Sequence, residues 1–573
     1  MTAQLPPTAA GPSCSAEEQA GTDRRVGRVY RPALPPTKTP MPGVSAHPGF
    51  GYRIEEHPSM IIEKDVAIPT RRGILYADIF RPKVGEDLPI LVGYGPFGKH
   101  PHYDIESMWA GSGIPFDTLS EYTAWELFDP VRWTDWGFAV AFVDGVGNWY
   151  SEGDATFFTP EEAWAGHDVV EWLGERDWSN GKVGWGGVSY YAMTAWSVAA
   201  TRPPHLAAIM PWDAASDCYR EAFFHGGIPS MPFIHSWMLL TGTGLSAAED
   251  MEAGMRNHPT FDEYWQCRVA DWSAIEVPTY AITEFPNNLH LRGTIEAWRA
   301  ISSTDKYLEI RGDKEWEGFY QPESVERQRQ FFERYLKGVD NEVADWSRVR
   351  IAVRSQADQW TFRDEPDWPL PDVQYRTLWL DARNGTLGDS CPVDEASVSY
   401  LSTDDEGAAT FQVTFDKRTE MTGNAKLRFW LSVDLSNDAD LFVGVEKVGS
   451  DGERVPFTYS QMYDDGPLGF GWLRASHRAL DDERSTPEQP WHSHTQRDWL
   501  IHGTPVPVDI EIWPNSVVFE PGESLRIVVK GTPIRRYSGP FEIVFAPLHN
   551  AGHHTIHTGK DFDSFFYMPV IER

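Results

Sequence analysis

The segment GWGGVSYYAMTAW, residues 184–196, places a serine between a run of small residues and an apolar helical pattern. In the pattern G-x-S-x-G, a sharp turn from a strand into a helix projects the serine hydroxyl as a nucleophile, and crowding at the turn requires small neighbours. Gly187 supplies the first glycine here, but Tyr191 stands where the second is expected. Because the motif is incomplete, Ser189 is a candidate nucleophile whose surroundings must decide its role.

Short apolar strands and helices alternate on both sides of this turn. The clearest helix signal covers residues 159–178, where Thr159 is a suitable N-cap, Pro160 takes the first helical position and Glu162 completes a capping box. Such alternation is typical of a parallel sheet covered by helices. The predicted strands are residues 89–95, 138–145, 182–187, 206–212, 278–285 and 306–312.

Changes in pattern divide the chain into five segments. Residues 1–46 are rich in proline, alanine, threonine and glycine, and they predict a disordered or extended arm. Residues 213–275 lack an obvious buried strand and predict a helical cap inserted between 47–212 and 276–345, the two parts of an α/β domain. From 346 to 573, short strands punctuated by glycine, proline and aspartate predict an antiparallel β-sandwich of the jelly-roll type.

Composition argues against several kinds of partner. The 573 residues include 84 acidic and 50 basic side chains, and the net charge of −34 repels nucleic acid and anionic lipid. The four cysteines have neither zinc-site nor disulfide spacing, and no apolar run is long enough to span a membrane. We therefore expect a cytoplasmic protein that acts on a small molecule, without a metal, a cofactor, nucleic acid or a membrane partner. The oligomeric state is left open, a homodimer included.

Five motifs carry a resemblance to a known family: GFAVAFVDGVGNWYSEGD, WSNGKVGWGGVSYYAMTAW, SDCYREAFFHGG, EPDWPLPD and IHTGKDFDSFFYMPVI, in that order. From about residue 60 to the end, the chain resembles the cocaine esterase and X-prolyl dipeptidyl-peptidase group of serine hydrolases. The resemblance implies an α/β-hydrolase fold with a helical cap, followed by a jelly-roll-like β-sandwich. It also implies that Ser189 attacks an acyl carbonyl, while the backbone N–H of Tyr190 stabilises the resulting oxyanion.

The chain departs from this family at three positions to which the resemblance assigns catalytic roles. Phe97, which has no hydroxyl, matches a tyrosine that donates to the oxyanion. Asn287 stands at or beside the position of the triad acid. Serine needs a base to accept its proton, so another residue must supply one if the chain hydrolyses its substrate. The position of the triad histidine is taken by one of Lys314, Glu315, Trp316 and Glu317.

Two residues are the best candidates for the missing base and its partner. His290, in NNLHLRG, follows a predicted strand and opens at the same sheet edge as Ser189, so we expect it to be the base. Glu317 is the expected carboxylate, which either orients an imidazole or accepts a proton itself; Glu284 and Asp313 are alternatives. The purely structural alternatives are a histidine packed at a helix start and carboxylates on a solvated loop.

The expected pocket is aromatic, in keeping with 25 tryptophans and an aromatic fraction of 13%. Three classes of function follow from these residues. The first is a serine hydrolase or acyl-transfer enzyme acting on an ester or amide with an apolar or aromatic acyl group. The others are a non-hydrolytic enzyme, such as a cyclase, lyase or isomerase, and a binding protein or pseudoenzyme. The candidate pocket residues are Tyr94, Phe97, Tyr191, His225, Asn287 and Trp316.

Overall fold

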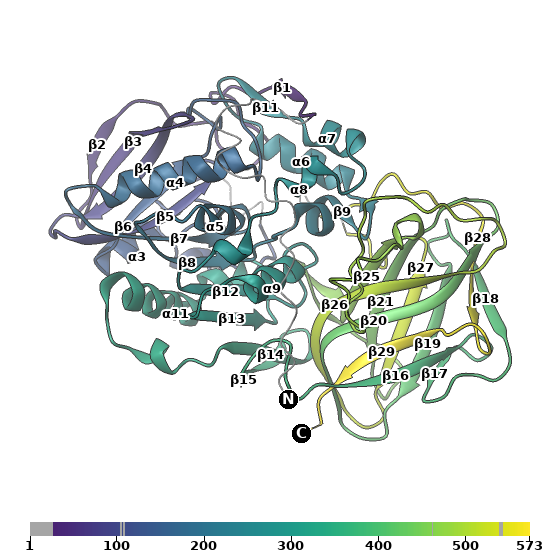
Figure 1. The fold of residues 1–573 in the computed structure, drawn as a ribbon. Helices are drawn as coiled ribbons and strands as arrows, with labels where there is room; N and C mark the ends of the chain where they lie inside the picture. The colour runs from purple at the N-terminus through teal and green to yellow at the C-terminus, as the bar shows by residue number, and fades with distance from the viewer. Residues whose placement is uncertain (1–26, 103–105, 107–108, 461, 538–541, 573) are drawn as a thin grey trace.

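The structure is a computed structural model of the 573-residue chain. Figure 1 shows two parts side by side: an α/β part formed by roughly the first two thirds of the chain, and a body of strands formed by the last third. Most of the predicted N-terminal arm lies outside the described residues. The described residues are 27–102, 106, 109–460, 462–537 and 542–572.

A mixed sheet forms the centre of the α/β part. Its strand order is β2-β3-β4-β6-β5-β7-β8-β12-β13-β14-β15, and neighbours from β6 to β14 run parallel. All six predicted strands form, as β5, β6, β7, β8, β12 and β13. The strands are β2 (Arg53–Glu56), β3 (Met60–Thr70), β4 (Gly73–Pro82), β5 (Leu88–Gly95), β6 (Ala139–Asp144), β7 (Ser179–Val188), β8 (Leu206–Trp212), β12 (Thr279–Glu284), β13 (Lys306–Arg311), β14 (Val349–Gln356) and β15 (Gln359–Glu365).

Helices pack on this sheet, and the predicted capping box is present at the start of one of them. The Thr159 side chain accepts a hydrogen bond from the Glu162 N–H, and Pro160 is the first helical residue. This helix, α4, ends at Gly174, four residues before the predicted end. The helices of the α/β part are α3 (Pro130–Asp135), α4 (Pro160–Gly174), α5 (Tyr190–Ala200), α9 (Leu291–Ala300), α10 (Glu317–Tyr320) and α11 (Pro322–Phe332).

The inserted segment 213–275 is helical in part, but it also contains short strands that the sequence pattern did not predict. Strand β11 pairs antiparallel with β1 (Tyr30–Pro32), which belongs to the predicted arm. This pairing joins residues far apart in the chain, so no local sequence pattern predicts it. The elements of the segment are β9 (Phe224–His225), β10 (Ile228–Pro229), α6 (Met231–Thr241), β11 (Ala247–Glu249), α7 (Met251–Asn257) and α8 (Glu263–Gln266).

The last third forms the predicted antiparallel sandwich, with its own apolar core between two sheets. In one sheet β20 pairs with β26, β28 and β29; in the other β27 pairs with β19 and β21. Strands β14 and β15 follow residue 346 but extend the first sheet, and β14 also pairs with the sandwich strand β26 at Arg354 and Val517. The strands are β16 (Gln374–Asp381), β17 (Thr386–Gly388), β18 (Ala396–Leu401), β19 (Ala408–Thr414), β20 (Thr419–Val433), β21 (Asp440–Val448), β22 (Arg454–Val455), β23 (Phe457–Tyr459), β24 (Tyr463–Gly466), β25 (Gly469–Arg474), β26 (Val506–Phe519), β27 (Ser524–Lys530), β28 (His553–Thr558) and β29 (Phe565–Val570).

Candidate active site

Ser189 occupies the sharp turn between β7 and α5. Its backbone has φ 56° and ψ −116°, a conformation that residues with a side chain rarely adopt and that is typical of strained functional turns. Its N–H donates to the Trp212 carbonyl at 3.0 Å, and its carbonyl accepts from the Met193 N–H at 2.8 Å. These bonds fix the turn from the neighbouring strand and from the helix that follows.

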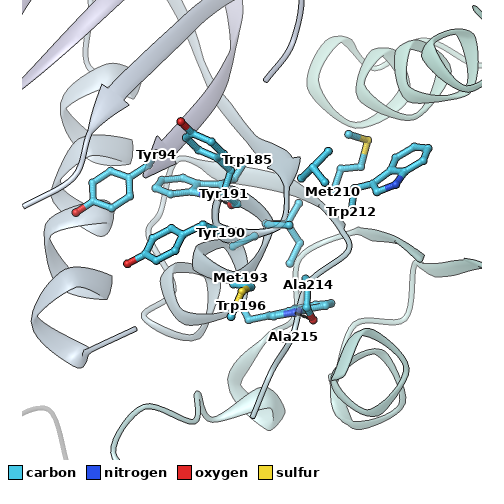
Figure 2. Packing of buried hydrophobic residues seen from close by; sticks show 14 of the residues in the cluster. Tyr94, Trp185, Tyr190, Tyr191, Met193, Trp196, Met210, Trp212, Ala214 and Ala215 are labelled. Atoms are coloured by element: carbon cyan, nitrogen blue, oxygen red, sulfur yellow. Dashed lines mark hydrogen bonds between the residues drawn. The ribbon is translucent and has the colours of Figure 1, made fainter. Parts of the chain in front are cut away.

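Packing explains why this turn needs one glycine and accepts a tyrosine in place of the other. A Cβ atom on Gly187, whose φ is +137°, would lie 2.6 Å from the Tyr191 Cβ. The Tyr191 ring occupies space that the absence of a side chain on Gly95 leaves open, since a Cβ there would lie 2.8 Å from the ring. Figure 2 shows Tyr191 beside Tyr94 and Trp185. Tyr191 is therefore a buried support of the turn.

Ser189 opens onto a cavity of about 650 Å³ that is partly open to solvent. Two of its tryptophans, Trp109 and Trp125, stack with ring centroids 4.3 Å apart, and Trp316 meets Trp109 edge-on at 4.1 Å. Among the described residues no lysine or arginine lines the cavity. Its aromatic lining includes Phe97, Trp109, Trp125, Tyr190, Trp237 and Trp316. Its ionisable or nucleophilic lining residues are Glu126, Ser189, His290 and Glu315.

His290 and Glu315 face each other in the cavity wall, and each side chain is 1% exposed. His290 Nδ1 accepts a hydrogen bond from the Ala215 N–H at 3.2 Å, so the proton of a neutral ring lies on Nε2. Nε2 is 3.5 Å from Glu315 Oε1. The other oxygen, Oε2, is buried without a hydrogen-bond partner in the described part of the chain. The histidine thus follows β12 and the carboxylate follows β13, the reverse of the order that the family resemblance implied.

Glu126 is a second carboxyl in the cavity wall, and sequence reasoning missed it. Its Oε1 accepts from the Trp316 Nε1–H at 2.9 Å, while Oε2 is buried without a partner among the described residues. Burial, reinforced by the neighbouring Glu315 carboxylate, raises the pKa of Glu126 well above its usual range. The residue lies in the loop before α3, away from any strand end, so no sequence signal marked it.

A pair of coupled carboxyls, Asp213 and Glu284, lies behind the turn at the ends of β8 and β12. Asp213 Oδ1 accepts from the Thr283 hydroxyl at 2.8 Å, and Glu284 Oε1 accepts from the Trp212 Nε1–H at 3.0 Å. Burial raises the pKa of both carboxyls, that of Asp213 to about 7, and the proximity of Asp213 raises that of Glu284 further. Two such close carboxyls share one proton. Asp213 was not among the predicted site residues, and neither member of the pair lines the cavity.

The structure places the predicted carboxylate Glu317 outside the cavity wall. Glu317 is the first residue of α10, and its side chain packs against Gly113, where a Cβ would lie 2.6 Å from the carboxylate carbon. Burial raises the pKa of Glu317 to about 7. Glu315, two residues earlier, is the carboxylate that faces His290. The predicted partner of His290 was Glu317. The start of α10 at Glu317 directs this side chain elsewhere and leaves Glu315 opposite the histidine.

Three further pocket candidates have structural roles outside the cavity wall. Asn287 Oδ1 accepts the N–H groups of Leu289 and His290 at 3.0 and 2.9 Å, which orders the chain before α9. The His225 Nε2–H donates to a backbone carbonyl at 2.8 Å, and burial lowers the pKa of this histidine to about 4. The Tyr94 hydroxyl accepts a backbone N–H at 3.1 Å. These three residues therefore do not line the cavity as predicted, because each side chain forms a hydrogen bond with the backbone beside the site.

The two residues predicted for the oxyanion site do line the cavity. Tyr190 is the first residue of α5, so its backbone N–H has no acceptor within the helix and is available beside Ser189. Its hydroxyl donates to Glu162 Oε1 at 2.7 Å and so points away from this role. Phe97 contributes only its ring, which contacts Tyr190 and Tyr191 at centroid distances of 6.0 and 5.7 Å.

Known proteins resemble the chain over both of its parts. A family model for X-Pro dipeptidyl-peptidase of the S15 family matches residues 74–255, and a model for the C-terminal non-catalytic domain of X-Pro dipeptidyl-peptidase matches residues 341–565. Cocaine esterase from Rhodococcus sp. (strain MB1 Bresler) is 27% identical over 411 residues, which cover 59% of this chain and 67% of that protein.

Solved structures resemble the whole architecture. A CocE/NonD family hydrolase from Staphylococcus aureus has a TM-score of 0.87 and 35% sequence identity, and the match covers 91% of this chain and 97% of that one. An α-amino acid ester hydrolase has a TM-score of 0.68 at 18% identity, with 93% of this chain and 100% of that chain covered, so that likeness concerns the fold. The predicted fold class and family resemblance are confirmed.

The described residues contain neither a metal-binding cluster nor a membrane-spanning helix. None of their histidine, cysteine, aspartate and glutamate side chains come together in groups of three or more that could hold a metal ion. In the same part of the chain, no helix has the length and apolar character required to cross a membrane.

Proposed function

Because this chain belongs to the CocE/NonD family of hydrolases, we propose that it cleaves an ester or amide with Ser189 as nucleophile and Glu315 as the acceptor of the serine proton. One observation carries the proposal: Ser189 on its strained turn lines the same aromatic cavity as Glu315, whose buried Oε2 has no hydrogen-bond partner among the described residues. A nucleophile next to a base that a third group orients is the arrangement required for acyl transfer.

The contacts of His290 support a positioning role for this residue. Its Nδ1 lone pair already accepts the Ala215 N–H, so the ring offers Glu315 a proton on Nε2 and has no free lone pair for the serine. Shortening the 3.5 Å separation from Glu315 by a few tenths of an ångström would form a hydrogen bond, and catalytic contacts often tighten when substrate binds. His290 then holds Glu315 Oε1 and leaves Oε2 to accept the proton.

The oxyanion site predicts slow turnover. The Tyr190 N–H stabilises the negative oxygen that forms when Ser189 attacks the carbonyl, but Phe97 has no hydroxyl to add a second donor. Loss of one such donor costs roughly 10²–10³ in turnover. We therefore expect a hydrolase that is slower than relatives with two oxyanion donors.

The cavity favours a substrate with an apolar or aromatic acyl group. Its walls are mainly aromatic, and the described residues offer no cation to pair with an anionic substrate. The carboxylate of Glu315 in the wall would repel an anionic substrate. A neutral or cationic ester or amide fits this lining best, and the acid released by the reaction is expelled because it carries a negative charge.

Kinetics with a panel of aromatic esters and amides test this function. Ser189→Ala is expected to lower kcat by about 10⁴–10⁶ and Glu315→Gln by about 10²–10⁴, the usual losses for a nucleophile and a base. Glu317→Gln is the matched control, since it removes a neighbouring carboxyl outside the cavity wall, and it should stay within a few-fold of the wild type. Full turnover by Ser189→Ala would contradict the proposal and favour a non-hydrolytic reaction.

A further inference from the structure

Glu126 is a buried carboxyl in the cavity wall for which the acylation step proposed above has no use. The side chain is 2% exposed, and its Oε2 has no hydrogen-bond partner among the described residues. An unpartnered polar atom at such burial is costly unless a ligand or a reacting group uses it. Glu126 lines the cavity together with Ser189 and Glu315.

The surroundings of Glu126 hold it rigidly next to the nucleophile. Its carbonyl accepts the Val188 N–H at 3.0 Å, one residue before Ser189. Its φ of 61° is unusual for a residue with a long side chain, and such strain concentrates at functional sites. The Trp316 Nε1–H binds Oε1 at 2.9 Å, and Trp316 itself packs against Trp109 and Trp125. These contacts hold the carboxyl in place and leave Oε2 as the oxygen without a hydrogen-bond partner among the described residues.

The groups around Glu126 favour its protonated form. The charged groups that act on it are the carboxylates of Glu315 and Asp213, and the neutral indole N–H groups of Trp316 and Trp125 also face it. Burial is the largest effect and raises the pKa, and both carboxylates raise it further; these effects outweigh the two indole N–H groups, which lower it. Because the Trp316 N–H occupies Oε1, the carboxyl proton lies on Oε2.

We propose that Glu126 is the general acid of the reaction and delivers its Oε2 proton to the leaving group. This inference rests on the function proposed above. When the bond from Ser189 Oγ to the acyl carbon forms, the serine proton moves to Glu315. When the bond to the leaving oxygen or nitrogen breaks, Glu126 protonates that atom, so the alcohol or amine departs neutral.

The second half of the reaction restores both carboxyls. Water attacks the acyl carbon and gives a proton to the Glu126 carboxylate. The bond to Ser189 Oγ breaks, and this oxygen takes back its proton from Glu315. The sum is ester plus water to acid plus alcohol, with every enzyme group returned to its starting form. One carboxyl thus donates first and accepts later, while the other does the reverse.

Leaving-group dependence in the full-length protein tests the role of Glu126. The substrates are the p-nitrophenyl and ethyl esters of one aromatic acid, since p-nitrophenolate leaves without a proton whereas ethoxide needs one. Glu126→Gln keeps an acceptor for the Trp316 N–H but has no acidic proton. We expect kcat on the ethyl ester to fall about 10²–10⁴-fold and kcat on the p-nitrophenyl ester to change only a few-fold. Near-normal turnover of the activated ester also shows that the variant is folded.

Two companion measurements complete the test. Trp316→Phe, which removes the donor to Oε1, should also lose more activity on the ethyl ester than on the p-nitrophenyl ester, whereas Glu317→Gln should lose little on either. Equal losses on both esters in Glu126→Gln, or no loss on either, would overturn the assignment while leaving Ser189 as nucleophile. Full turnover of both esters by Ser189→Ala would instead contradict the acyl-enzyme reaction and, with it, the proposed role of Glu126.

Discussion

Three residues with side chains adopt left-handed backbone conformations around one site. Glu126, Ser189 and Asp213 have φ values of 61°, 56° and 53°. Each such residue costs of order 1–3 kcal/mol and persists only where the surrounding structure enforces it. Ser189 and Glu126 line the cavity, and Asp213 lies behind the turn, where it accepts a hydrogen bond from Thr283. Three of the twelve described residues that combine a side chain with a positive φ therefore lie in or behind the site where acid–base chemistry is proposed.

Substitutions of His290 can distinguish whether this residue positions Glu315 or acts as the base itself. His290→Gln keeps an N–H that can bind Glu315, whereas His290→Leu does not, and neither side chain can act as a base. We expect kcat to fall roughly 10- to 100-fold in His290→Leu, the worth of a hydrogen bond to a charged group, and clearly less in His290→Gln.

The measurement is kcat and KM for an aromatic ester, with thermal melting to confirm folding. KM should change little in both variants. An equal and severe loss of kcat in the glutamine and leucine variants would show that His290 is the base and that Glu315 only orients it.

Part of the site could be predicted residue by residue, and part could not. Ser189, Tyr190 and His290 follow strand ends that meet at one sheet edge, so strand prediction alone placed them near one another. The sequence pattern predicts Glu317 as the carboxylate partner of His290, but Glu315 faces it. A difference of two residues depends on where a short helix starts, which the sequence pattern does not fix. Glu126 lies in an irregular loop whose path is set by tertiary packing, and no periodic pattern could place it.

At the scale of elements, helix α4 supports the catalytic turn through its N-terminus. The Phe158 N–H donates to Glu162 Oε2 at 2.8 Å, and the same carboxyl accepts from the Tyr190 hydroxyl through Oε1 at 2.7 Å. The capping box therefore connects the first turn of α4 to the first residue of α5. A local sequence signal, readable without the structure, thus contributes to the position of Ser189.

Removal of the α4 cap should loosen this helix. Thr159→Ala deletes the acceptor for the Glu162 N–H, and we expect the free energy for opening the amides of α4 to fall by about 1 kcal/mol. Native-state hydrogen exchange measures this change. Thr304→Ala, at an exposed threonine, is the control and should stay within about 0.5 kcal/mol. Unchanged exchange in α4 of Thr159→Ala would contradict the capping role.

Long-range pairings mark the limit of prediction at this scale. Buried apolar runs identified β5, β6, β7, β8, β12 and β13 because burial on both faces leaves a continuous apolar sequence. Strand β11 was missed because it is three residues long and pairs with β1, more than two hundred positions away. The exact start of the sandwich could not be predicted either, since β14 pairs both with β13 of the first sheet and with β26 of the sandwich.

At the scale of the whole molecule, buried carboxyls make stability depend on pH. Burial raises the pKa of Glu542 to about 8 and those of Glu126 and Glu284 well above their usual range. These groups keep protons in the folded protein at pH values where the unfolded chain has lost them. Stability from this source is complete below the unfolded pKa, near 4.5, and is lost as pH rises through the folded pKa.

We therefore expect the melting temperature to fall between pH 7 and 9. The buried histidines such as His225 have lowered pKa values and are neutral in both states across this window, so they do not offset the trend. Glu542→Gln should reduce the fall, because it removes one group that titrates near pH 8. A melting temperature that stays constant or rises over this range, or a Glu542→Gln variant with an unchanged slope, would contradict the expectation.

In the proposed function, the fold holds an acylated Ser189 in an aromatic cavity. Rapid-quench mass spectrometry of the full-length protein mixed with a p-nitrophenyl ester of an aromatic acid tests it most directly. The account predicts a transient mass increase equal to the acyl group, located on the peptide that contains Ser189, absent in Ser189→Ala and slower to form in Glu315→Gln. Turnover of the ester without any adduct on Ser189, at a rate that Ser189→Ala retains, would contradict it.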